Sequence, residues 1–192
     1  MKVVIIGGVA GGATTATRLR RLNEKAEIII LERGYHISFA NCGLPYYIGD
    51  VIKQKEELLL QTPQSFKERF NIEVRIRQEA IQINRDNKTV QVKNLETGEV
   101  YEESYDKLVL SPGAEPTNLF KKIIDSRIKT LRTVEDAIAI KQYIEENKPQ
   151  NVTIIGGGYI GVEMAENLSQ YSDMELNIIE QSSHVIAPLD ED

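Results

Sequence analysis

The residue with the greatest chemical potential in this sequence is its only cysteine, Cys42. It lies in the stretch Ile-Ser-Phe-Ala-Asn-Cys-Gly-Leu-Pro-Tyr-Tyr at 37–47, which could be helical for about one turn before Pro45 disturbs it. In a first helical turn, unpaired backbone N–H groups and the helix dipole would favour the thiolate, which attacks disulfides, peroxides or sulfur. A lone cysteine is more often a small buried hydrophobe, so the neighbouring motifs must decide between the two interpretations.

The first of these motifs is a glycine-rich turn at 7–12, with the sequence Gly-Gly-Val-Ala-Gly-Gly. It follows a predicted buried strand, Val3–Ile6, and precedes the predicted helix Ala13–Leu22. The next predicted strand ends in Glu32. In a dinucleotide-binding βαβ unit, such glycines permit a tight turn, the helix N-terminus holds a pyrophosphate and the acid takes ribose hydroxyls. One position departs from that fingerprint, because Val9 replaces the middle glycine.

A second copy of the pattern follows the predicted strand Val152–Ile155 and precedes a predicted helix through Leu168. The strand after that helix ends in Glu180. All three fingerprint glycines are present here: Gly156, Gly158 and Gly161. Two such units beside a redox cysteine indicate one site for FAD and one for a nicotinamide cofactor, so that electrons can pass from NAD(P)H through flavin to sulfur.

The remaining pattern predicts an α/β fold. It comprises an FAD/NAD(P)-binding, Rossmann-like, three-layer domain with an inserted β-hairpin, followed by the start of a second Rossmann-like unit. We expect the FAD-binding domain with the redox cysteine at 1–115, and the connection and nicotinamide unit at 116–192. Further strands are predicted at Ile28–Leu31, Ile72–Ile76, Ala80–Ile83, Thr89–Val92, Val100–Tyr101, Leu108–Leu110 and Leu176–Ile179. Further helices are predicted over Glu56–Phe70, interrupted near Pro63, and from a capping box at Thr133–Asp136 to Lys148, after a connection at Glu115–Lys129.

Composition excludes several other functions. The chain is 41% hydrophobic and 27% charged, with a net charge of −6 and no basic block, which argues against nucleic acid as a partner. No apolar run approaches the ~18 residues of a membrane span. One cysteine cannot form an internal disulfide, which fits a reducing cytoplasm. Two histidines without clustered partners offer no metal-site spacing.

Taken together, the motifs resemble the pyridine nucleotide-disulfide oxidoreductases with a single active-site cysteine, and most closely their coenzyme A disulfide reductase branch. The first glycine turn of that branch has valine where this chain has Val9. Sister NADH oxidases and peroxidases usually have serine in place of Asn41 and lack the following Leu-Pro. The motifs that match are 7–13, 38–46, Ser111-Pro112-Gly113-Ala114 and 156–163.

The resemblance implies a role for each matching residue. Cys42 would be catalytic. The FAD contacts would be Gly7, Val9, Ala10, Gly11, Glu32, Arg33, Ser111, Pro112, Gly113 and Arg132. The nicotinamide contacts would be Gly156, Gly158, Tyr159, Ile160, Gly161, Glu163 and Glu180, and the coenzyme A contacts would be Arg21, Ser38 and Asn41. The pair Arg18 and Arg21 could equally form a solvated helix face, and Glu163 a helix surface charge. Because a carboxylate at Glu180 repels a 2′-phosphate, NADH is favoured, although NADPH can also serve.

The implied reaction is reduction of coenzyme A disulfide, or of a related persulfide. NAD(P)H passes hydride to FAD, and the reduced flavin delivers two electrons to Cys42 held as a mixed disulfide with coenzyme A. The absence of a second cysteine excludes an internal dithiol route. In the oxidase or peroxidase alternative, Cys42 would instead cycle through a sulfenic acid.

Members of this family are much longer than 192 residues. They continue with the rest of the nicotinamide domain, a third flavin motif ending in Gly-Asp, and a dimerisation domain that supplies a tyrosine to the partner's active site. The resemblance therefore implies a homodimer for the full-length protein. We expect this chain to be a fragment or a split subunit, and the alternative of another class is a nucleotide-binding fragment without turnover by itself.

Overall fold

The computed structural model of the chain describes residues 1–117, 123 and 125–189. Their contacts form two compact units, which are described separately below. Unit 1 consists of Met1–Phe39 and Leu59–Ala114, and unit 2 consists of Ala40–Leu58 and the chain from Glu115 onward. The cysteine segment therefore clusters with the C-terminal part of the chain.

Unit 1 is built around a parallel sheet with the strand order β3-β2-β1-β7. Its central pair is formed of continuous apolar runs, as is expected for strands that are covered on both faces. The register of β1 and β2 pairs Lys2 with Glu27 and Ile6 with Leu31, so both strands end at the same edge. The strands are β1 (Lys2–Ile6), β2 (Glu27–Glu32), β3 (Glu73–Ile76) and β7 (Lys107–Leu110).

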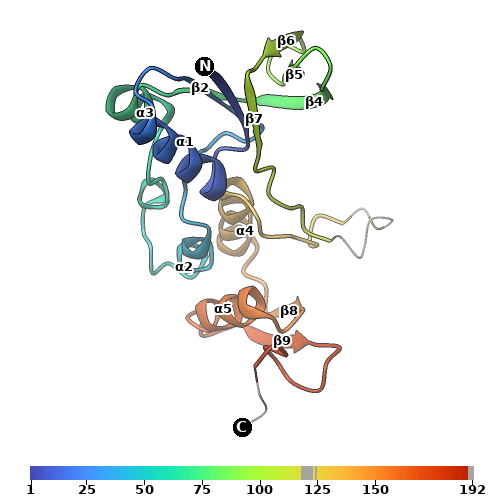
Figure 1. Cartoon of the computed structure of the whole chain (residues 1–192). Coiled ribbons are helices and arrows are strands. Elements are labelled where there is room, and N and C mark those ends of the chain that lie inside the picture. Colours follow the sequence, from blue (N-terminus) through green and yellow to red (C-terminus); the bar gives the residue numbers. More distant parts are fainter. Residues whose placement is uncertain (118–122, 124, 190–192) are drawn as a thin grey trace. The chain divides into compact units, whose positions relative to one another are not determined.

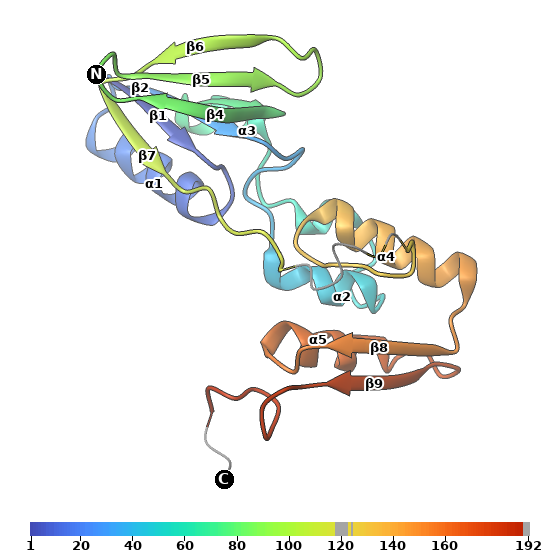
Figure 2. The same cartoon turned by 90° about the vertical axis from the view of Figure 1, so that its right-hand side faces the viewer.

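Side chains of the central strands alternate between two cores, which makes unit 1 a three-layer structure (Figure 2). Val3 and Ile5 pack on one face with α1 (Ala10–Leu22) and α3 (Pro63–Phe70). Val4 packs on the other face with an antiparallel sheet of order β4-β5-β6. That sheet contains the predicted hairpin, β5 (Thr89–Asn94) with β6 (Val100–Ser104), extended by β4 (Gln78–Asn84). The predicted three-layer Rossmann-like fold is therefore confirmed.

Unit 2 contains a two-stranded parallel sheet with α5 packed against it, and the short helix α2 beside α4 and α5 (Figures 1 and 2). In this sheet β8 and β9 pair in parallel, as β1 and β2 do in unit 1. The elements are η1 (Asn41–Gly43), α2 (Leu44–Ile48), η2 (Lys55–Leu58), α4 (Val134–Asn147), β8 (Asn151–Ile155), α5 (Tyr159–Leu168) and β9 (Glu175–Ile179). The predicted capping box is confirmed, since Thr133 accepts from the N–H of Asp136.

Two proline predictions are wrong, for the same physical reason. Pro63 begins α3 instead of interrupting a longer helix, and only a short 3₁₀ turn, η2, precedes it. Pro45 lies in the first turn of α2 and does not disturb that helix. The first turn of a helix needs no N–H from these positions, and the fixed φ of proline suits it. At α3, Thr62 and Ser65 complete a capping box around the proline.

The predicted connection at 115–129 forms no helix or strand in its described residues, and 118–122 and 124 lie outside them. Within the described ranges, none of the helices combines the length and apolar character that crossing a bilayer would require.

A buried carboxylate links three strands of unit 1 and makes its stability depend on pH. Glu103 is 8% exposed, 2.5 Å from the ammonium of Lys2 and ion-paired with Arg75. Burial alone would raise the pKa of Glu103, but hydrogen bonds from Lys2 and Arg75 outweigh it and lower that pKa. Because the pKa of Glu103 is lower in the folded chain than in the unfolded chain, its ionised form stabilises the fold at pH values above the ordinary glutamate pKa of about 4.3. This contribution is lost as the pH falls below that value.

We therefore expect Glu103→Gln to lower the free energy of unfolding at pH 7 by roughly 2 kcal/mol, because Lys2 and Arg75 each lose the more buried of their two ionic partners among the described residues and keep only Glu27 and Glu73. The variant should also lose part of the decline in stability below about pH 4.5. Urea unfolding at pH 7 and pH 4 measures both effects. The exposed Glu102→Gln is the neighbouring control, and equal pH profiles for Glu103→Gln and wild type would contradict the prediction.

Candidate functional site: two dinucleotide turns and a redox cysteine

The first glycine turn, between β1 and α1, has the backbone shape that a pyrophosphate site requires. Gly7 has a φ of +96°, and a Cβ there would lie 1.9 Å from the carbonyl oxygen of Ser111. A Cβ on Gly12 would lie 1.7 Å from the carbonyl oxygen of Gly7, so the helix can approach the turn only with glycine here. No side chain caps α1 and its first turn holds no acid, which leaves the N-terminal N–H groups for an anion.

Glu32, at the end of β2, is fixed beside this turn. Its carboxylate accepts the N–H of Gly8 at 2.7 Å through Oε2 and the N–H of Gly34 at 2.7 Å through Oε1. These two bonds hold the carboxylate in one orientation and leave further lone pairs on both oxygens for ribose hydroxyls. Ser38 joins the same turn, since its N–H donates to the carbonyl of Gly8 at 3.0 Å.

The second glycine turn, between β8 and α5 in unit 2, reproduces this arrangement. Gly156 has a φ of +105°, and a Cβ on Gly161 would lie 2.0 Å from its carbonyl oxygen. Glu180 accepts the N–H of Gly157 at 2.6 Å and the N–H of Ser182 at 2.7 Å. The bonds from Ser182 and Gly157 lower the pKa of Glu180 to about 2, so its charge persists at neutral pH. The α5 N-terminus also lacks a side-chain cap and an acid.

The two turns explain why the fingerprint tolerates a valine. Val9 and Gly158 are the N-cap residues of α1 and α5, with φ values of −87° and −73°. Neither conformation needs glycine. The glycines that the backbone does require, Gly7 and Gly12 in the first turn, are both present.

Other predicted flavin contacts surround the first turn at the end of β7. The N–H of Ser111 donates to the carbonyl of Ile6 at 2.8 Å and so continues the sheet pairing by one residue. The Oγ atom of Ser111 would lie 3.2 Å from a Cβ on Gly11. Pro112 and Gly113 follow as exposed residues, Gly113 with a φ of +72°. Arg33 is exposed on the turn after β2. Unit 1 therefore brings these predicted FAD contacts together, except for Arg132, which belongs to unit 2.

Cys42, the predicted redox cysteine, lies in the 3₁₀ turn η1, directly before α2 in unit 2, and is exposed. Neighbouring residues pack tightly: a Cβ on Gly43 would lie 2.9 Å from the side chain of Leu58. Asn41 is half-buried, and its Oδ1 atom is buried without a hydrogen-bond partner among the described residues. An accessible thiol beside an amide with an unmet acceptor is suited to reaction with an external ligand.

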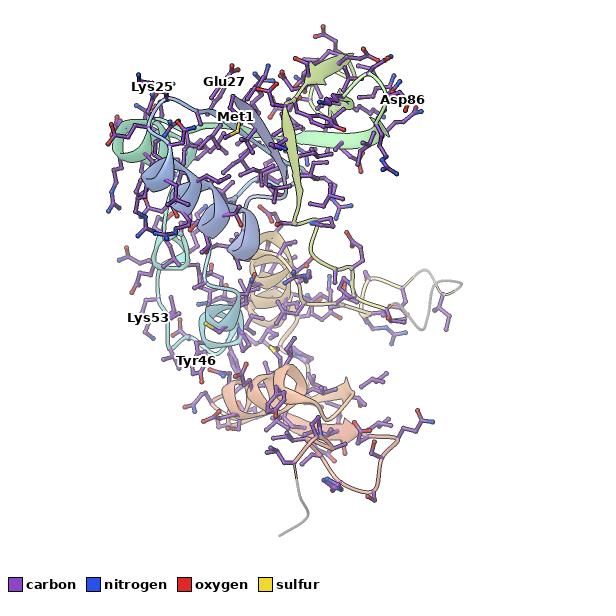
Figure 3. The ribbon with its side chains drawn as sticks, viewed as in Figure 1. Met1, Lys25, Glu27, Tyr46, Lys53 and Asp86 are labelled. Atoms are coloured by element: carbon purple, nitrogen blue, oxygen red, sulfur yellow. The ribbon has the colours of Figure 1, made fainter. Side chains whose placement is uncertain are left out.

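The C-terminal end of α2 is anchored by residues that the sequence analysis did not identify. Buried Lys141 of α4 donates to Asp50 at 2.9 Å and lies 4.5 Å from the ring centroid of Tyr47. The hydroxyl of Tyr171 donates to the Ile48 carbonyl at 2.8 Å. A Cβ on Gly49 would lie 2.7 Å from Cβ of Asn167, so α5 approaches the chain closely there. Figure 3 shows Tyr46 on α2 and Lys53 on the chain that follows α2.

The remaining predicted contacts are more dispersed. In unit 1, Arg21 is exposed on α1, and its Nε donates to the Thr17 carbonyl at 3.4 Å. In unit 2, Tyr159 and Ile160 are 55% and 60% exposed at the start of α5, and Glu163 is half-buried one turn later. Arg132 precedes α4, where its N–H donates to Asp136.

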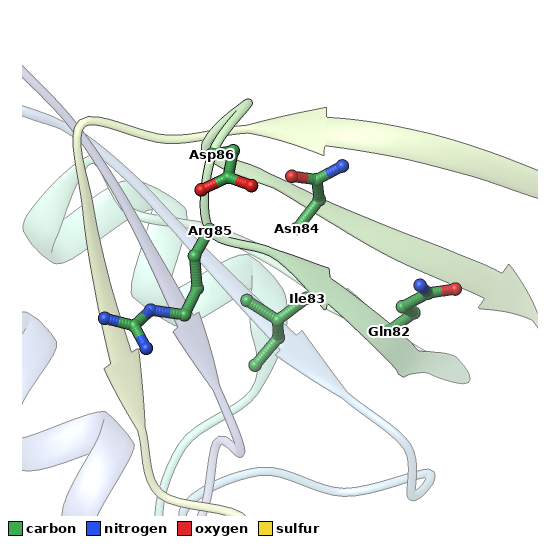
Figure 4. A pocket seen from close by; sticks show the side chains of 5 residues that line it. All are labelled: Gln82, Ile83, Asn84, Arg85 and Asp86. Atoms are coloured by element: carbon green, nitrogen blue, oxygen red, sulfur yellow. The ribbon is translucent and has the colours of Figure 1, made fainter.

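An open depression at the end of β4 does not belong to these sites. Figure 4 shows its lining at the β4–β5 turn, and no predicted site residue takes part in it. The lining residues are Gln82, Ile83, Asn84, Arg85 and Asp86.

Comparison with known proteins places the whole arrangement in a family. The model of the family described as pyridine nucleotide-disulphide oxidoreductase matches residues 1–192. The chain belongs to this family. A curated relative, the coenzyme A disulfide reductase of Staphylococcus haemolyticus (strain JCSC1435), is 42% identical over 191 residues, which are 100% of this chain and 43% of the relative. The chain thus spans less than half the length of that relative.

Two solved structures support the same assignment. Reduced Bacillus anthracis CoADR-RHD superposes with a TM-score of 0.92 at 49% identity, covering 98% of this chain and 34% of that chain. A NAD-dependent persulfide reductase from A. fulgidus gives a TM-score of 0.92 at 35% identity, covering 99% of this chain and 36% of that chain. The predicted family and fold are confirmed, and the roles of individual site residues stay predictions.

Proposed function

We propose that this chain is the flavin and nicotinamide portion of an FAD-dependent NAD(P)H:disulfide oxidoreductase that reduces coenzyme A disulfide, or a coenzyme A persulfide, through Cys42. The observation that carries the proposal is the repeated turn. Each copy has a left-handed glycine, an uncapped helix N-terminus and a carboxylate that accepts two backbone N–H groups, one from the glycine turn and one from the residue two positions after the acid. Two dinucleotide sites with a single exposed thiol suit electron transfer from one nucleotide through the other to sulfur.

Unit 1 fits FAD and unit 2 fits the nicotinamide nucleotide. The N-terminus of α1 would hold the flavin pyrophosphate, and Glu32 the ribose hydroxyls of its adenosine half. The N-terminus of α5 and Glu180 would do the same for NADH. When bound, FAD supplies a route by which the hydride of NAD(P)H becomes two electrons for sulfur. The flavin part would be formed by 1–115, including the cysteine segment 40–58 that clusters with unit 2, and the nicotinamide part by 116–192.

Cys42 performs the sulfur chemistry. Its thiolate attacks one sulfur of coenzyme A disulfide, the disulfide bond breaks, and a coenzyme A thiolate leaves as the mixed disulfide forms. Two electrons then cleave the mixed disulfide, releasing the second coenzyme A thiolate, which takes a proton from solvent, and restoring the Cys42 thiolate. Ser38 and Asn41, and Arg21 on α1, are the proposed coenzyme A contacts. A reducing cytoplasm would keep Cys42 in its thiol form between turnovers.

The absorption spectrum of the purified chain tests this proposal. Flavin bands that appear after addition of FAD and bleach with NADH under anaerobic conditions would support both nucleotide sites. A chain that takes up no flavin would show that these 192 residues do not bind FAD by themselves and that the activity requires the remainder of the longer, homodimeric protein. A sulfenic acid on Cys42 after peroxide treatment, with no coenzyme A adduct, would favour the oxidase alternative.

Glu180 should determine the preference for NADH. Its pKa of about 2 keeps a full negative charge where a 2′-phosphate would lie, so discrimination against NADPH should increase between pH 5 and pH 8 only as the 2′-phosphate, with a second pKa of about 6, gains its second charge. We expect Glu180→Ala to weaken NADH binding about tenfold. The ratio of the NADH affinity to the NADPH affinity should fall by at least the same factor. Titration of both nucleotides by fluorescence measures the ratio.

The exposed Glu166→Gln, on the same helix as the site, is the matched control and should change neither affinity. An unchanged ratio in Glu180→Ala would show that the carboxylate only braces the turn through Gly157 and Ser182.

A further inference from the structure

One aromatic residue of unit 1 has an arrangement that packing alone does not explain. Tyr35 lies on the turn after β2, three residues beyond Glu32, and is 50% exposed. The guanidinium carbon of Arg77 lies 4.2 Å from the centroid of its ring. Because this distance is well within the range of cation–π contacts, Arg77 covers the ring on one side.

Arg77 is fixed in place by its backbone. It joins β3 to β4 with a φ of +58°, its N–H donates to the Gly34 carbonyl at 3.2 Å, and its carbonyl accepts from Leu95 at 2.8 Å. Its side chain also donates to the carbonyl of Arg33 at 3.3 Å. The turn that carries Glu32 and Tyr35 is therefore fastened to the β3–β4 junction by two hydrogen bonds from a single arginine.

A second arginine–aromatic pair in the same unit differs from Tyr35 and Arg77, because its ring is packed against the core. Arg69 lies 5.3 Å from the ring centroid of Phe70 on α3. Phe70, however, packs against the core and meets the ring of Phe66 edge-on at 5.5 Å. The Phe70 ring thus has a packing role, whereas the Tyr35 ring remains half in solvent despite its ordered partner.

The position of Tyr35 indicates which ligand group it would meet. Glu32 is placed to bind the ribose hydroxyls of a dinucleotide, and the adenine ring is bonded to that ribose. Adenine is a flat π system that stacks on aromatic rings and on guanidinium planes. We infer that Tyr35 and Arg77 form the surface on which the adenine ring of the flavin dinucleotide rests, and that this surface selects FAD over FMN. The inference rests on the proposed flavin site and adds two residues to it.

The test compares three probes on the purified chain: FAD, FMN and ADP. Tyr35→Ala should raise the FAD dissociation constant about tenfold, the size of effect expected when a base loses an aromatic partner. ADP binding should weaken by a similar factor, while FMN binding, which involves no adenine, should change less than twofold. Tyr35→Phe keeps the ring and should bind all three probes as the wild type does.

Arg77→Gly gives an independent variant, because glycine adopts the left-handed backbone of Arg77 without strain. It should weaken FAD several-fold, and its effect should not add to that of Tyr35→Ala, since the two side chains act as one surface. Arg69→Ala is the matched control and should leave FAD affinity unchanged. Thermal unfolding of each variant without ligand separates these effects from loss of fold.

The outcomes distinguish this inference from the proposed function. A wild-type chain that binds neither FAD nor ADP would overturn the flavin site and this inference together. A wild-type chain that binds FAD, with Tyr35→Ala binding it equally well, would overturn only the adenine surface. Equal weakening of FAD and FMN in Tyr35→Ala would also overturn it, because the ring would then support the turn without contacting the base.

Discussion

A Gly12→Ala variant should lose FAD binding almost completely while retaining its affinity for NADH. The added methyl group would lie 1.7 Å from the carbonyl oxygen of Gly7 and 3.2 Å from the side chain of Ile5, so the turn and α1 must separate. This displacement would remove the N–H groups from the place proposed for the flavin pyrophosphate. We expect FAD affinity to fall at least about 100-fold, roughly 2.7 kcal/mol, with a further loss of folding stability from overpacking.

The second turn supplies the reciprocal experiment. Gly161→Ala would place a methyl group 2.0 Å from the Gly156 carbonyl oxygen, so NADH binding should be lost while FAD binding persists. Gly158→Ala is the control for folding alone, because a Cβ there meets nothing within 4 Å and the φ of −73° is ordinary, whereas its NADH affinity is no control since Gly158 is itself a proposed nicotinamide contact. Its fold should be unaffected. Loss of both ligands in either alanine variant, measured by separate FAD and NADH titrations, would show that the two turns are not independent sites.

The glycine turns were predictable because their chemistry is local. Strand, glycines, helix and acid follow one another within about thirty residues, and the backbone they imply is what the structure shows around Gly7 and Gly156. The three-layer fold was predictable for the same reason, since the apolar runs of β1 and β2 require cover on both faces. Pro63 was misinterpreted because its meaning depends on the Thr62 cap that precedes it.

The surroundings of Cys42 could not be predicted, because they depend on residues distant in sequence. Lys141 reaches Asp50 across 91 positions, and Tyr171 reaches the Ile48 carbonyl across 123. A lysine within the predicted helix 133–148 gives no sign that it will be buried against an aromatic ring. The pairing of Tyr35 with Arg77 is equally hidden, since only the parallel register of β2 and β3 brings their ends together.

The second large expected effect is the proposed reaction of Cys42 with coenzyme A disulfide. The wild-type chain should gain the mass of one coenzyme A moiety, removable by dithiothreitol, because the exposed thiolate displaces a coenzyme A thiolate from the disulfide. Cys42→Ser should gain none, since the chain has no other cysteine. Intact-protein mass spectrometry over time gives the rate as well as the product.

The rate distinguishes a coenzyme A site from an ordinary exposed thiol. If Ser38 and Asn41 contact coenzyme A, Asn41→Ala should slow the reaction with coenzyme A disulfide about tenfold and leave the reaction with 2-hydroxyethyl disulfide unchanged, because that reagent has no nucleotide to bind. The exposed Lys53→Ala, in the same segment, is the control. Equal rates with both disulfides in the wild type would contradict a coenzyme A site in this chain. Such a result would leave Cys42 as an accessible thiol whose substrate selection depends on the remainder of the longer protein.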